Sequence, residues 1–428
     1  MELFAIIFFC FLLIAYWYTI KKKGAGILAL ALVGLYTLSA LTSIIVYEGR
    51  PERFSDVNVF SYIVLFLFLI ISFLPIVHFR KEKYEGIRLL SESYSNIIAI
   101  ALIILNIPVA IDIIPKAITS YQSMLLDFAI ATELYGETAE MVKEQTGSSF
   151  ENIAEVLRGI SSGILIFYSF YYLACPFRKK ILVVLLWVCV FLPIPASLLS
   201  ASRTGLSYWV LEMFVAYCIF SPFMKQKNQK RLRAVMITFG VFLVLVFGAL
   251  TIGRFGASEF KADNEVQKSV AEYFGQGTLH FSADVLQNDT YQWGDGTMPF
   301  FRQILGLSYS KNIYDRQAKW GNSMKIEQGA FYTYIGDLCC DFSPYLAFIL
   351  VFIVSIIFNK GINQNNNSFM GTPRLFLLFF ICSICYDGLF YFSFKTIGGN
   401  LKLIMNMLFF IFIQTRVVNS GQKIKYKI

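Results

Sequence analysis

Two arginines lie beside long apolar runs in this sequence of 428 residues. Arg203 occupies a short turn between the runs Ile181–Leu199 and Leu206–Phe223, and Arg254 follows the run Ala234–Ile252. A guanidinium beside segments long enough to cross a membrane is costly unless it lies at the lipid–water boundary or in a wet cavity. Such an arginine either anchors the chain among the lipid headgroups or binds phosphate oxygens in pairs. A pair of them could clamp a diphosphate and stabilise the charge that develops as the diphosphate leaves.

One histidine and two aspartates are the candidates for proton transfer. His280 lies in the long polar segment 253–331, whereas His78 lies at the far end of another apolar run. Imidazole suits the removal of a proton from an alcohol, although a lone histidine in a loop is more often structural. Asp337 and Asp341 enter the next apolar run. A carboxylate there would orient a base, accept a hydroxyl proton or cap a helix N-terminus.

Aromatic residues are interleaved with amides and carboxylates in the segment 253–331. This mixture suits sugar rings, and an aromatic belt at a membrane interface has a similar composition. We expect neither a metal nor another cofactor. The sequence has no Asp-x-Asp motif, no cluster of His and Cys, no Walker A loop and no dinucleotide-binding glycine motif. The candidate substrate-binding residues are Tyr291, Trp293, Asp295, Arg302 and Asp337.

The composition indicates that a membrane surrounds the elements that position these residues. Hydrophobic residues make up 57% of the chain and charged residues 15%, with a mean hydropathy of +0.60. A soluble protein would carry about 25% charged residues. Apolar runs recur from end to end, which predicts an all-α, polytopic integral membrane protein with a single domain, 1–428. About eleven transmembrane helices are expected, at 3–20, 27–47, 59–79, 97–114, 160–174, 181–199, 206–223, 234–252, 334–358, 375–392 and 397–413.

Basic residues predict the orientation of these helices. The basic clusters that share one side of the predicted spans lie at 21–23, 80–88, 178–180, 225–233, 360–374 and 416–427. Because cytoplasmic loops carry the excess of Lys and Arg, we expect the N-terminus outside and the C-terminus in the cytoplasm. The net charge of +9 then reflects orientation and not binding to nucleic acid. The turn at 200–205 and two long loops, about 116–158 and 253–331, are expected to be extracytoplasmic.

Three short motifs resemble a known family. Ser202-Arg203-Thr204-Gly205, after a helix that contains proline, resembles the Ser-Arg-[Thr/Gly] turn of bacterial O-antigen polymerases of the Wzy type and their ligase relatives. Gly253-Arg254-Phe255 and the re-entry Tyr334–Phe342 are similar to that family in order and spacing, over residues 160–415. Where the family commonly has Asp-Phe-Gly, this chain has Asp341-Phe342-Ser343. The resemblance implies that Arg203 and Arg254 engage undecaprenyl diphosphate, and that His280 or Asp341 activates the acceptor hydroxyl.

The same resemblance implies a metal-independent glycosyltransferase of the bacterial cytoplasmic membrane. It would polymerise undecaprenyl-diphosphate-linked oligosaccharide repeat units on the outer face, with such lipids as donor and acceptor. Membrane lipids and a chain-length regulator protein would be its other partners. One alternative is an O-antigen ligase, which differs in using a lipid A–core acceptor. Another is a flippase or other transporter, although Asp112, Glu212 and Asp387 lie in predicted spans with few basic residues to pair with them, which counts against transport.

Overall fold

The computed structural model describes residues 1–126, 149–199, 203–255, 265–324, 326, 330–363, 368–417 and 423–425. The chain forms two compact units, each assembled from separate stretches of sequence. Unit 1 consists of Met1–Glu82, Gln267–Asn366 and Phe380–Leu401, and unit 2 of Lys83–Val266, Asn367–Phe379 and Lys402–Ile428. The helices α16 (Thr372–Asp387) and α17 (Ile397–Val417) contribute residues to both units.

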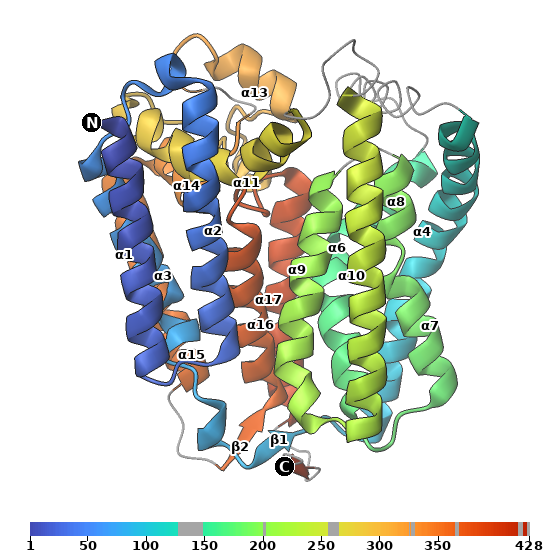
Figure 1. The fold of residues 1–428 in the computed structure, drawn as a ribbon. Helices are drawn as coiled ribbons and strands as arrows, with labels where there is room; N and C mark the ends of the chain where they lie inside the picture. Colours follow the sequence, from blue (N-terminus) through green and yellow to red (C-terminus); the bar gives the residue numbers. More distant parts are fainter. Residues whose placement is uncertain are drawn as a thin grey trace. The chain divides into compact units, whose positions relative to one another are not determined.

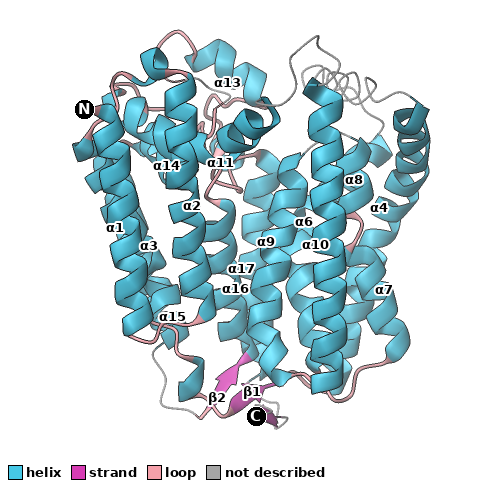
Figure 2. Cartoon of the chain, viewed as in Figure 1, coloured by secondary structure: helices cyan, strands magenta, loops and turns pink. Residues whose placement is uncertain are grey.

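Unit 1 combines long apolar helices with a group of short ones (Figures 1 and 2). The long helices are α1 (Glu2–Lys22), α2 (Ile27–Gly49), α3 (Val59–Val77) and α15 (Pro344–Asn363). The short elements at one end are η1 (Pro51–Phe54), α11 (Glu265–Ala283), η4 (Val285–Gln287), α12 (Pro299–Ile304), α13 (Ile313–Trp320) and α14 (Thr333–Phe342). The helix α3 packs against α1 and α15 and starts at a capping residue, because the Asn58 side chain accepts a hydrogen bond from the Ser61 N–H at 2.9 Å. Near the other end, η2 (Lys81–Lys83) follows α3.

Unit 2 is a helical bundle with a small sheet at its basic end. Its helices are α4 (Glu92–Leu126), α6 (Ser149–Ala174), α7 (Lys180–Val190), α8 (Pro193–Leu199), α9 (Arg203–Phe220), η3 (Ser221–Phe223) and α10 (Gln226–Phe255). In the sheet, β1 (Gly86–Arg88) pairs in parallel with β2 (Phe369–Gly371) and antiparallel with β3 (Lys423–Lys425). Aromatic rings fill the bundle: Phe167 contacts the rings of Phe220 and Phe376 at 5.1 and 5.0 Å.

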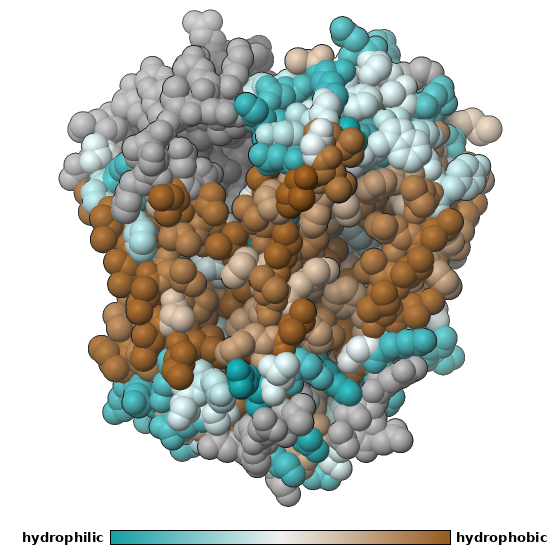
Figure 3. Space-filling model, turned by 180° about the vertical axis from the view of Figure 1, so that it is seen from behind, coloured by the Kyte–Doolittle hydropathy of each residue, from teal (hydrophilic) through white to brown (hydrophobic). Residues whose placement is uncertain are grey.

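Nine helices in the described part of the chain are long and apolar enough to cross a membrane. Their exposed side chains are hydrophobic over the middle of each helix and hydrophilic near the ends, as Figure 3 shows from behind. The prediction of an all-α, polytopic membrane protein is therefore confirmed. The number of eleven spans, the orientation and the single domain stay predictions.

One predicted span is wrong as a single helix. The segment predicted as 334–358 divides into α14 and α15 at Ser343, which has φ 71° and ψ 154°. The ring of Pro344 disfavours a helical conformation for the residue before it and removes one backbone donor. Ser343 thus adopts a positive φ that glycine adopts easily and other residues rarely adopt.

The predicted loops contain more helix than expected. The segment 253–331 includes α11, α12 and α13, and α4 and α6 extend into the segment 116–158. The predicted span 181–199 is interrupted between α7 and α8, because Pro193 and Pro195 cannot continue a regular helical ladder. The helices α11, α12 and α13 contain charged and polar residues, so they do not stand out as apolar runs in the sequence.

The pairing of in-span acids also differs from the expectation. Glu212 of α9 accepts a hydrogen bond from Lys402 of α17, with 3.1 Å between Oε1 and Nζ, and both side chains are largely buried. Lys116 pairs with Asp112 at 2.7 Å within α4. Few basic residues were expected to pair with the in-span acids, and two of the three acids do have such a partner, one from a distant helix and one from the next helical turn.

Glu212→Gln is expected to destabilise unit 2 substantially. Removing one partner of a buried ion pair leaves the other charge uncompensated, which costs about 3–5 kcal/mol. The midpoint of thermal unfolding of the purified protein should therefore fall clearly, and Lys402→Met in the same chain should restore much of it. The control is Asp112→Asn, whose partner Lys116 is exposed. Equal effects of Glu212→Gln and Asp112→Asn would show that the buried pair has no special importance.

Candidate functional site

The Asp341 carboxylate organises a tight turn in unit 1. It is fully buried near the end of α14 and accepts hydrogen bonds from the backbone N–H groups of Gly294, Gly296 and Thr297 at 2.8, 3.1 and 2.9 Å. The Thr297 hydroxyl donates a further bond to the same carboxylate. Burial raises the pKa of Asp341, and these hydrogen bonds oppose that shift. Both oxygens of Asp341 are therefore engaged in holding the turn, which favours a positioning role over proton transfer.

Two glycines allow the turn to close around this carboxylate. Gly294 has φ +92°, a backbone conformation that side chains rarely tolerate. A Cβ atom on Gly296 would lie 2.1 Å from the Gln292 side chain and 3.2 Å from Asp341. The Trp293 N–H donates to the Asp341 carbonyl at 2.8 Å, so the backbone of the turn is also bonded to the end of α14.

Asp295 connects this turn to α13. Its buried carboxylate accepts hydrogen bonds from the Ser310 N–H at 2.6 Å, the Trp320 indole at 2.7 Å and the Lys319 ammonium at 2.9 Å. Burial alone would raise the pKa of Asp295, but the bonds from Trp320, Lys319 and Ser310 outweigh it and hold that pKa below its usual range. Asp295 is thus an ionised structural centre and not an exposed contact for a sugar.

Trp293 and Arg302 lie at the surface of the same turn. The Arg302 guanidinium donates to the carbonyls of Trp293 and Ser308, at 2.6 and 2.8 Å. The Trp293 side chain is 60% exposed, and its ring stands edge-on to that of Tyr291 with 6.3 Å between centroids. An exposed aromatic ring on a backbone held this firmly can stack on a sugar at low entropic cost.

His280 belongs to a separate chain of polar contacts. Its Nδ1 lies 2.7 Å from the carboxylate of Asp284, the residue that directly follows α11, and Asp284 pairs with Arg53 at 3.3 Å. The rings of Phe54 and Tyr332 flank the imidazole, which is only 6% exposed. A carboxylate that accepts a hydrogen bond from Nδ1–H leaves Nε2 of the neutral imidazole able to accept a proton. The same bonds connect α11 to η1.

Asp337 holds a buried lysine that the sequence reading did not select. Lys395, in the loop between α16 and α17, lies 3.1 and 3.3 Å from the two oxygens of Asp337, which also accepts the Phe392 N–H at 2.6 Å. The ammonium lies 4.4 Å from the centroid of the Tyr391 ring. Burial lowers the pKa of Lys395, and Asp337 opposes that shift.

Arg203 and Arg254 belong to unit 2. Arg203 is the first residue of α9 and Arg254 the penultimate residue of α10, and their side chains lie outside the described residues. The helices are antiparallel neighbours that both line one apolar groove, which brings Met213 level with Val235. At 1.5 Å per residue, Arg254 then lies about 14 Å farther along the bundle than Arg203. A shared diphosphate would require both side chains to extend towards it along the helix axes.

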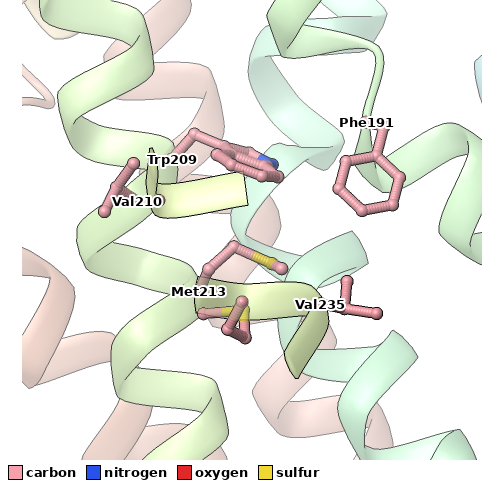
Figure 4. Close-up of a pocket in the computed structure, with 7 residues that line it drawn as sticks. Phe191, Trp209, Val210, Met213 and Val235 are labelled. Carbon is pink, nitrogen blue, oxygen red and sulfur yellow. The ribbon is translucent and has the colours of Figure 1, made fainter. Parts of the chain in front are cut away.

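The apolar groove itself lies beside the interruption between α7 and α8. Figure 4 shows Phe191, Trp209 and Met213 around it, with Val235 from α10. The Trp209 indole donates to the Val190 carbonyl at 2.7 Å, which satisfies an acceptor released where α7 ends. The lining offers no polar group for catalysis and fits packing against lipid or an apolar chain.

The structure brings six of the nine predicted site residues into one network. Trp293 and Asp295 belong to the turn, and Asp341 and Arg302 are hydrogen-bonded to it. Tyr291 precedes the turn, and Asp337 lies one helical turn before Asp341 in α14. His280 lies on α11, and the two arginines belong to the other unit. Sequence reasoning missed three residues whose partners are distant in the chain: Lys395, Asn400 and Arg53. It also did not pair His280 with Asp284, although a separation of four residues is the spacing of neighbours on a helix.

No protein family, curated protein or solved structure matches the chain. Within the described ranges, no group of three or more His, Cys, Asp or Glu side chains is placed to hold a metal ion. The proposed chemistry therefore rests on the residues of the site alone.

Proposed function

We propose that the protein is a membrane glycosyltransferase that polymerises undecaprenyl-diphosphate-linked oligosaccharide repeat units on the outer face of the bacterial cytoplasmic membrane. The observation that carries the proposal is the polar network around Asp341, built on short helices at one end of a bundle of apolar helices. This network presents the exposed ring of Trp293, and the separate His280–Asp284 pair lies in the same unit of the protein.

The arrangement of unit 1 supports an outer position for this network. Arg50, after α2, pairs with Glu272 of α11 at 2.8 Å, and Tyr47 of α2 bonds to Glu2 at the N-terminus. The N-terminus therefore shares an end of unit 1 with α11, α13 and α14 (Figure 1). Arg80 donates to the Lys23 carbonyl at the other end, where the basic residues of this unit gather. The excess of basic residues in cytoplasmic segments favours that end as the inner one.

The proposed reaction transfers the growing glycan from one lipid diphosphate to a sugar hydroxyl of the next repeat unit. A bond forms between that hydroxyl oxygen and the anomeric carbon, and the bond from this carbon to the diphosphate breaks. His280 would take the hydroxyl proton at Nε2, with Asp284 orienting the ring. Arg203, and Arg254 if it reaches the same group, would stabilise the departing diphosphate. Trp293 would hold a sugar ring by stacking.

His280→Gln is expected to slow polymerisation by roughly 100-fold or more, because a positioned general base contributes that much. The measurement is the length of glycan that purified protein makes in liposomes from lipid-linked repeat units. Glu272→Gln, on the same helix but partly exposed, is the control. An unchanged rate for His280→Gln in a folded protein would exclude the histidine as base. If the wild-type protein leaves the repeat units unjoined, the polymerase proposal is wrong.

Two other functions can be tested in the same liposomes. A ligase would join the glycan only when a lipid A–core acceptor is supplied. A transporter or flippase is favoured by one observation, the buried Glu212–Lys402 pair among membrane helices, since ionisable pairs inside a membrane often mark a transport pathway. Movement of intact repeat units across the bilayer, without any change in their length, would support that second candidate.

A further inference from the structure

Arg316 is a buried cation without a counter-charge among the described residues. Its side chain belongs to α13 in unit 1, the residue is 8% exposed, and its Nε atom has no hydrogen-bond partner in that part of the chain. Removing a guanidinium from water is costly unless its donors are satisfied. An oxygen of a bound phosphate is an acceptor that would satisfy this donor.

A second buried cation lies in the same network. The loop of Lys395 and the helix of Arg316 are both bonded to the tight turn, through Asn400 and Trp320. Burial lowers the pKa of Lys395, Asp337 raises it, and the charge of Arg316 lowers it. The side chain of Lys395 is 16% exposed, and Asp337 is the carboxylate that pairs with it. Two positive charges therefore meet one negative charge in a largely buried cluster.

Hydrogen bonds fix the two segments that carry these cations. The helix α13 is held by Trp320 and Lys319, which both donate to Asp295 in the tight turn. The Asn400 side chain donates to the Thr297 carbonyl of that turn and to the Phe394 carbonyl, next to Lys395, at 2.9 and 2.6 Å. The positions of the two cations are thus preset before any ligand binds, which lowers the entropic cost of binding.

We propose that Arg316 and Lys395 form a binding site for a phosphate or diphosphate group in unit 1. Arginine supplies a planar fork for two phosphate oxygens and lysine a compact charge, while Asp337 holds the ammonium in place. Combined with the proposed function, this site would hold the diphosphate of one of the two lipid-linked substrates. It differs in sequence and in structural unit from the Arg203 and Arg254 candidates.

The test measures binding of inorganic pyrophosphate to the full-length protein in detergent by calorimetry, followed by competition. Arg316→Gln is expected to weaken binding at least tenfold, and Lys395→Gln to weaken it as well. Arg50→Gln is the control, because Arg50 is exposed and already paired with Glu272. Since Lys395→Gln leaves Asp337 without its cation, thermal unfolding is recorded for each variant, and Arg316→Gln alone decides the outcome if Lys395→Gln does not fold.

Competition identifies the source of the phosphate. Displacement of pyrophosphate by undecaprenyl diphosphate, but not by phosphatidylglycerol, would assign the site to the lipid-linked substrate. Equal displacement by phosphatidylglycerol would support the anion site while assigning it to phospholipid headgroups. Wild-type affinity in Arg316→Gln, or no binding of pyrophosphate and undecaprenyl diphosphate to the wild-type protein, would overturn the proposal. Binding by a protein that joins no repeat units would contradict the proposed function and leave the anion site standing.

Discussion

Asp341→Ala is expected to disorder the turn 292–297 and to abolish activity, although the change removes one side chain that no substrate need touch. Three backbone N–H groups and the Thr297 hydroxyl would lose their acceptor inside the protein. An unsatisfied buried donor costs about 1–3 kcal/mol, so the free energy of unfolding should fall by on the order of 4 kcal/mol or more. Asp341→Asn should restore little of the lost stability, because the amide nitrogen places a hydrogen-bond donor where the turn needs an acceptor.

The measurement combines thermal unfolding with limited proteolysis of the purified protein. Cleavage should become faster between Tyr291 and Trp320, because Asp295 can no longer hold α13 once the turn is loose. Asp56→Asn is the matched control: this carboxylate is exposed at the same end of unit 1. If Asp341→Ala unfolds and is cleaved like the wild-type protein, the turn keeps its conformation without the carboxylate. A stable but inactive Asp341→Ala would instead point to a direct role in the reaction.

Arg203→Lys is expected to be nearly as inactive as Arg203→Ala. If the guanidinium stabilises the leaving diphosphate, its contribution depends on two donors in one plane, which lysine lacks. Removing one donor that stabilises developing charge commonly costs about 2.7–4 kcal/mol of barrier, or roughly 100- to 1,000-fold in rate. Cells with either variant should therefore make surface glycan limited to single repeat units, with a near-normal amount of the protein in the membrane.

The anchoring role of Arg203 predicts a different pattern. Lysine reaches the headgroups as well as arginine, so Arg203→Lys would make full-length polymer and Arg203→Ala would lower the amount of protein in the membrane. Glycan length measured beside membrane abundance separates the two roles. Arg254→Lys and Arg254→Ala provide the comparison, because α10 carries this residue about 14 Å farther along the bundle. Activity loss at Arg203 alone would show that the arginines do not act as a pair.

The sequence by itself determined that this is an all-α membrane protein, because the span of a bilayer sets the length and apolarity of each helix locally. It also singled out Asp295 and Trp293 in the polar segment 253–331, and Asp337 and Asp341 at the start of the apolar run that follows. The roles of these residues depended on partners far away in the chain. Asp341 is 44 to 47 positions away in the sequence from the turn residues that it binds, and Asp337 is 58 positions away from Lys395.

Only the tertiary structure decided which candidates act as structural centres and which remain exposed. Composition predicts a polar, aromatic loop for 253–331. In the structure, hydrogen bonds from backbone groups of the turn satisfy Asp341, and those from α13 and Ser310 satisfy Asp295, while Trp293 stays at the surface. The pairing of Glu212 with Lys402 joins two helices that the sequence separates widely, and the pairing of Asp337 with Lys395 joins a helix to a distant loop. Charge pairing of this kind depends on which helices pack together, and apolar periodicity carries no record of that choice.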